Sequence, residues 1–119
     1  MKKALIIVAA ALALASCAPK EQNPFMQEWD TPYGIPPFDK IKIEHYMPAI
    51  KAGIAEQEAE IKAIVDNPAA PTFENTVAAL ELSGNLLSKV TGVLYNLSET
   101  ENSPEMEALI EEATPLQSQ

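Results

Sequence analysis

FENTVAALELSGNLLSKVTGVLYNL, residues 73–97, contains more apolar side chains than one neighbouring helix can cover. At about 100° per residue these side chains span an arc of roughly 160°, wider than the stripe of roughly 100° that faces a single neighbour. They are Ala79, Leu80, Leu82, Leu86, Leu87, Val90, Val93, Leu94 and Leu97. We therefore expect one long helix over residues 73–97, capped by Thr72, with two helical partners.

The preceding segment, residues 44–66, predicts the first of these partners. Its apolar side chains fall within an arc of roughly 100°, the width of one core-facing stripe; they are Tyr46, Met47, Ile50, Ile54, Ile61, Ile64 and Val65. Glu58 and Lys62 are spaced for an exposed i,i+4 ion pair, and Asn67-Pro68 is typical of a helix end. The short connection to Thr72 predicts an antiparallel helical hairpin.

A third helix is predicted from Ser103 onward. Ser103 is a suitable cap, Pro104 suits the first helical position, and an apolar i, i+3, i+4, i+7 pattern follows. The chain ends soon afterwards, so we expect only the start of this helix and a truncated chain. Residues 23–43 are too rich in proline for a helix and too aromatic for a solvated tether, which predicts an irregular strap on the helices. The fold class is all-α.

The overall charge excludes one class of partner. The 119 residues carry eight lysines, no arginine and 17 acidic residues, for a net charge of -9. Because nucleic-acid binding depends on Lys and Arg to displace counterions, nucleic acid is not expected as a partner.

The first residues have the pattern of an export signal. Lys2 and Lys3 precede an apolar run over residues 4–15, which is too short to span a bilayer permanently. Leu14-Ala15-Ser16-Cys17 resembles the lipobox of bacterial lipoproteins, so Cys17 is the predicted lipidation site and attaches the protein to a membrane of the cell envelope. Cleavage as an ordinary secretory signal is the alternative. The expected organisation is a signal peptide over 1–16, a lipidated linker over 17–22, the strap over 23–43 and helices over 44–119.

The exported residues offer no catalytic or metal site. A zinc site needs three or four ligands, and the sequence offers one histidine, His45, and one cysteine, Cys17. His45 lies far from the apolar arc of its helix, so we expect it to be exposed in the first turn. Glu56, Glu58 and Glu60 alternate on a helix and cannot converge on one atom. The serines have no nearby base.

Several blocks, in order, resemble the N-terminal region of bacterial peptidyl-dipeptidases, also called dipeptidyl carboxypeptidases, of the thimet oligopeptidase and oligopeptidase A family. The blocks are Asn23-Pro24-Phe25, Gly34-Ile35-Pro36-Pro37-Phe38-Asp39-Lys40-Ile41, Glu44-His45-Tyr46-Met47-Pro48-Ala49-Ile50, Thr72-Phe73-Glu74-Asn75-Thr76, Ala79-Leu80-Glu81 and Ser83-Gly84. The resemblance implies a large helical zinc peptidase that acts on oligopeptides. Its zinc is held by a His-Glu-x-x-His motif that residues 1–119 lack, so no catalytic or metal-binding residue is carried over and this chain is not expected to bind zinc.

The sequence is consistent with two functions. The resemblance favours the N-terminal part of a lipid-anchored peptidyl-dipeptidase, a metallopeptidase that releases C-terminal dipeptides from oligopeptides. The alternative is a small helical envelope lipoprotein that binds a partner without catalysis, through the uncovered side of the second helix.

Overall fold

A computed structural model describes residues 22–118, and the predicted signal peptide and Cys17 lie outside them. Two short 3-10 turns, η2 (Pro24–Met26) and η3 (Pro32–Gly34), belong to the strap. Helix α2 (Ile43–Val65) is followed by the short π-helix η4 (Phe73–Ala78) and by the α-helices α3 (Ala79–Glu81), α4 (Asn85–Thr100) and α5 (Pro104–Gln117). The part of the chain that is described is all-α, as predicted.

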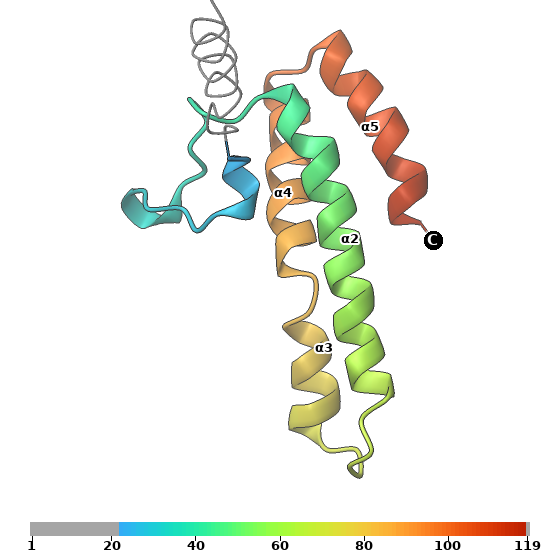
Figure 1. The fold of residues 1–119 in the computed structure, drawn as a ribbon. Coiled ribbons are helices and arrows are strands. Elements are labelled where there is room, and N and C mark those ends of the chain that lie inside the picture. Colours follow the sequence, from blue (N-terminus) through green and yellow to red (C-terminus); the bar gives the residue numbers. More distant parts are fainter. Residues whose placement is uncertain (1–21, 119) are drawn as a thin grey trace, which may run out of the picture.

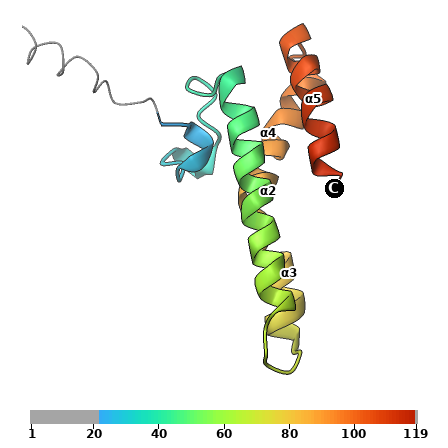
Figure 2. The same ribbon diagram turned by 45° about the vertical axis from the view of Figure 1, so that its right-hand side comes forward.

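The central unit is a hairpin in which α2 runs antiparallel to η4, α3 and α4 (Figure 1). The strap and α5 lie on opposite sides of this hairpin, near the end where α2 begins (Figures 1 and 2). The buried apolar residues come from the strap, α2, α4 and α5. They are Phe25, Tyr46, Ala49, Ile50, Val90, Val93, Leu94, Met106, Leu109 and Ala113. The core is therefore concentrated at one end of the hairpin.

The helix starts follow their predicted caps. The Thr72 hydroxyl accepts a hydrogen bond from the Asn75 backbone at 3.1 Å, and the Ser103 hydroxyl accepts one from the Met106 backbone at 3.2 Å. Helix α5 runs further than expected, to Gln117, with Pro115 in its last turn. Lys62 pairs with Asp66, so the predicted Glu58–Lys62 pairing is wrong.

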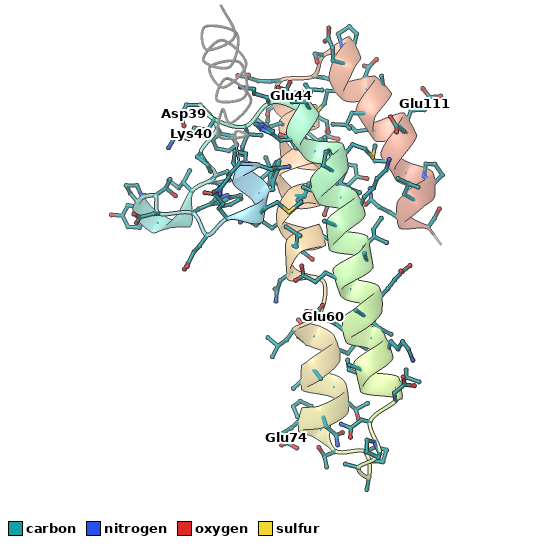
Figure 3. All side chains as sticks on the ribbon, in the orientation of Figure 1. Asp39, Lys40, Glu44, Glu60, Glu74 and Glu111 are labelled. Atoms are coloured by element: carbon teal, nitrogen blue, oxygen red, sulfur yellow. The ribbon has the colours of Figure 1, made fainter. Side chains whose placement is uncertain are left out.

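The predicted single helix over residues 73–97 is wrong, because the structure breaks it between α3 and α4. Gly84 has φ +71°, a left-handed conformation that glycine adopts without strain. Its backbone N–H donates to the Glu60 carboxylate of α2 at 2.8 Å. A Cβ at Gly84 would also lie 2.5 Å from the Gln57 side-chain nitrogen. Contacts with α2 therefore fix the break. Figure 3 shows Glu60 beside the gap between α3 and α4.

The buried face of α2 differs from the predicted stripe. Ala49 and Gly53 are buried, whereas Ile61 and Val65 are exposed. At Gly53 an added Cβ would lie 2.7 Å from the Leu87 backbone nitrogen, so the two helices cross in close contact here. Small residues thus set the face of α2 that packs against α4, because they allow the closest approach.

The end of the hairpin away from the core leaves apolar side chains in solvent. Val65, Phe73, Val77, Leu80 and Leu82 are each more than half exposed. Of the apolar arc predicted for the second helix, Leu80 and Leu82 are therefore left uncovered within residues 22–118, whereas Val90, Val93 and Leu94 are buried.

Candidate functional site

His45 is the first candidate for a catalytic or metal-binding residue, but its contacts give it a structural role. Its side chain is buried, 8% exposed, and Nδ1 accepts a hydrogen bond from the Lys42 backbone at 3.0 Å. The Asn23 side chain donates to the His45 carbonyl at 2.7 Å, which holds the strap over this turn. The prediction of an exposed His45 is wrong, because helical-wheel position alone ignores the strap that covers the first turn of α2.

The acidic residues do not assemble a site either. Over residues 22–118 no three His, Cys, Asp or Glu side chains are grouped as metal ligands. Glu60 is engaged with the Gly84 backbone, while Glu56 and Glu58 are exposed on α2. Figure 3 likewise places Glu44, Glu74 and Glu111 on separate parts of the fold.

Lys89 of α4 fastens the strap to the hairpin. Its ammonium group donates to the Phe25 carbonyl at 3.2 Å and to the Gln27 carbonyl at 2.5 Å. It also lies 4.2 Å from the ring centroid of Trp29, a cation–π contact. Burial lowers the pKa of Lys89, an effect that the nearby Glu28 carboxylate opposes. The sequence pattern gives no sign of this role, because a lysine on a helix is ordinarily solvated.

A groove lies between the strap and α4, beside Lys89. We call it the strap groove; it has a volume of about 460 Å³ and is lined by Trp29, Pro36, Phe38, Lys89, Gly92, Val93, Asn96, Leu97 and Thr100. A smaller hollow at Phe38, Ile41, Leu97 and Glu101 shares two of its residues and extends it along α4. The groove is formed mainly by apolar surface. It is therefore better suited to packing against another protein segment than to catalysis.

The hydroxyl of Tyr46 is a buried polar atom for which residues 22–118 provide no hydrogen-bond partner. Its ring is 2% exposed and contacts Phe25 with ring centroids 4.9 Å apart. Burial raises the pKa of this phenol, because a phenolate loses its hydration there.

Tyr46→Phe is expected to stabilise the chain by about 1 kcal/mol at pH 7, because it removes an unsatisfied buried hydroxyl. Since the folded pKa lies above that of the unfolded chain, wild-type stability falls as pH rises above about 10, where the unfolded phenol ionises. The variant lacks this contribution, so its advantage grows above pH 10. Urea unfolding at pH 7 and pH 10.5 measures both effects, and Tyr95→Phe, at a 40% exposed ring, is the control. A less stable Tyr46→Phe chain would contradict the assignment.

Cys17, the predicted lipidation site, lies outside the described residues, so its role stays a prediction. Within residues 22–118, the helices are all too short or too polar to cross a bilayer.

Together, the fold and the strap groove define an all-α helical segment that presents packing surfaces. No family model matches the chain. It is 45% identical over 89 residues to the dipeptidyl carboxypeptidase of Salmonella typhimurium. The aligned residues make up 75% of this chain and 13% of the relative. It is 42% identical over 90 residues to the Escherichia coli dipeptidyl carboxypeptidase, covering 76% and 13%. Oligopeptidase A of Salmonella typhimurium is 30% identical over 89 residues, covering 75% and 13%.

The chain belongs to the dipeptidyl carboxypeptidase and oligopeptidase A family, and it corresponds to the N-terminal region of that family. It spans 13% of the length of these relatives.

Proposed function

We propose that this chain is the N-terminal helical part of a zinc-dependent peptidyl-dipeptidase, a peptidase that removes dipeptides from the C-termini of oligopeptides. The observation that carries the proposal is the 45% identity to a dipeptidyl carboxypeptidase over three quarters of the chain. In this proposal the chain contributes packing surface to a larger enzyme, and the catalytic groups come from elsewhere in that enzyme.

The residues that the structure describes do not fit a zinc site. Among residues 22–118 the imidazole of His45 is buried and its Nδ1 caps α2, and no cluster of acidic ligands accompanies it. Zinc in the proposed enzyme would therefore be held outside residues 22–118, and no step of hydrolysis is assigned to these residues.

A chimera tests this proposal. In the Salmonella typhimurium dipeptidyl carboxypeptidase, the residues aligned with this chain are replaced by the residues of this chain. We expect the chimera to release dipeptides from a synthetic oligopeptide within about tenfold of the parent rate, and the isolated chain to release none and to retain no stoichiometric zinc. Mass spectrometry of the products and metal analysis of the dialysed proteins provide the measurements.

An inactive but folded chimera, or zinc bound tightly to the isolated chain, would contradict the proposal. The first outcome would favour the alternative function, a non-catalytic binding module, for which the strap groove is the supporting observation.

We further propose that the protein is exported and lipid-anchored in the cell envelope through Cys17, on the strength of the Leu14-Ala15-Ser16-Cys17 sequence behind an apolar run. Expression in a bacterial host should yield protein in the detergent phase after phase partitioning, and Cys17→Ala should move it to the aqueous phase. Partitioning of Cys17→Ala into detergent would contradict lipidation.

A further inference from the structure

Gly92 occupies a position in α4 where this chain has no need of a glycine. It lies in the middle of a 16-residue helix, where glycine is less favourable than alanine. Apart from its own helix backbone, a Cβ built at Gly92 meets no atom of the described residues within 4 Å, whereas one at Gly53 meets the Leu87 backbone. Gly53 therefore permits a close helix crossing inside the chain, and Gly92 leaves the same kind of space open to the outside.

The open space at Gly92 forms part of the strap groove. The groove's polar groups are largely used within the chain: the Asn96 amide donates to the Gly92 carbonyl at 2.7 Å, and the Thr100 hydroxyl donates to the Asn96 carbonyl at 3.0 Å. Lys89, the charged side chain among the described lining residues, is engaged with the strap carbonyls and Trp29. An occupant would thus meet apolar side chains and bare helix backbone, which suits the apolar face of another helix.

We propose that the strap groove seats a helix from the remainder of the peptidase polypeptide, with Gly92 at the crossing point. This inference rests on the proposed function, because the occupant is taken from the greater part of the relatives' length that the aligned residues do not include. A second copy of the chain is a poorer occupant, since each copy carries a net charge of -9. An oligopeptide substrate is also a poorer occupant of the strap groove, because the described lining offers no free cation to bind its terminal carboxylate.

The test compares the isolated chain with the chimera described above. In the isolated chain, Gly92→Ala should raise the unfolding midpoint by about 3–6 °C, and Gly92→Leu should not lower it, because the side chain enters open space. In the chimera, Gly92→Leu should lower the unfolding midpoint by at least about 5 °C and the peptidase rate by about tenfold or more, because it blocks the crossing.

Ala55→Leu is the matched control, because Ala55 is an exposed helical residue of α2 that lies outside the strap groove. It should leave the midpoint of the chimera within about 2 °C of the parent chimera. The control separates the loss of a specific crossing from the general effect of adding a leucine to a helix surface.

Three outcomes would overturn the inference. If the Gly92→Leu chimera is as stable and active as the parent chimera, no helix crosses α4 at Gly92. The activity of the parent chimera would then still support the proposed function. A dimer of the isolated chain that Gly92→Leu converts to monomer, seen by light scattering, assigns the groove to a second copy. A raised KM with an unchanged midpoint assigns it to the peptide.

Discussion

Replacing Gly53 by valine should destabilise the isolated chain by about 2–3 kcal/mol, one of the two largest effects we expect from a single substitution. An added Cβ would lie 2.7 Å from the nitrogen and 2.8 Å from the Cα of Leu87. Both atoms belong to the backbone of α4, so the overlap cannot be relieved by a side-chain rotation. The helices would have to move apart, which loosens the packing of Ile50 and Val90 in the core.

Thermal unfolding followed by circular dichroism measures this effect, and a fall of about 10–20 °C in the unfolding midpoint is expected. Gly92→Ala is the control, since it adds a Cβ to a helical glycine in open space. It should raise the unfolding midpoint by about 3–6 °C, as expected for alanine in place of glycine inside a helix. If Gly53→Val unfolds at the wild-type temperature, then α2 and α4 do not cross as closely as the structure shows.

The sequence predicted the helical elements well where the signals are local. Thr72 and Ser103 cap the segments they were expected to cap, and the helix expected over residues 44–66 corresponds to α2, Ile43–Val65. Capping and proline positions depend on interactions within a few residues, so they can be read from sequence alone.

The errors arise where tertiary contacts decide. Gly84 lies within an apolar helical pattern, but its left-handed backbone is held by Glu60, 24 positions earlier. The predicted buried face of α2 is wrong because the apolar pattern omits Ala49 and Gly53, which permit the closest contact with α4. The prediction of an exposed His45 is wrong because the strap, and not a helix, covers it.

The features of the candidate site that the sequence does not predict also depend on tertiary contacts. Lys89 is polar on a helical wheel, yet its position below the strap turns it into a hydrogen-bond donor to Phe25 and Gln27. The strap groove depends on how an irregular segment lies against α4, which no periodicity predicts. The Ser83-Gly84-Asn85 sequence could have indicated the helix break, because glycine and asparagine are common where helices end and restart.

The strap depends on one aromatic anchor, so Phe25→Ala should destabilise the chain by about 3–5 kcal/mol. Phe25 is 1% exposed and contacts both Tyr46, at 4.9 Å between ring centroids, and Trp29, at 6.3 Å. Its carbonyl also accepts a hydrogen bond from Lys89 at 3.2 Å. Removing the ring leaves a cavity in the core and releases the segment that carries Trp29.

Trp29 is the single tryptophan of the sequence, so its fluorescence reports on the strap directly. Phe25→Ala should shift the Trp29 emission to longer wavelength in native buffer, because the indole loses its contacts with the Phe25 ring and with Lys89. Phe38→Ala, at a ring that is 51% exposed, is the matched control and should cost less than about 1 kcal/mol with little spectral change. Wild-type emission from Phe25→Ala would mean that the strap is held by its polar contacts, namely Lys89 with the strap carbonyls and Asn23 with the His45 carbonyl, rather than by the buried ring.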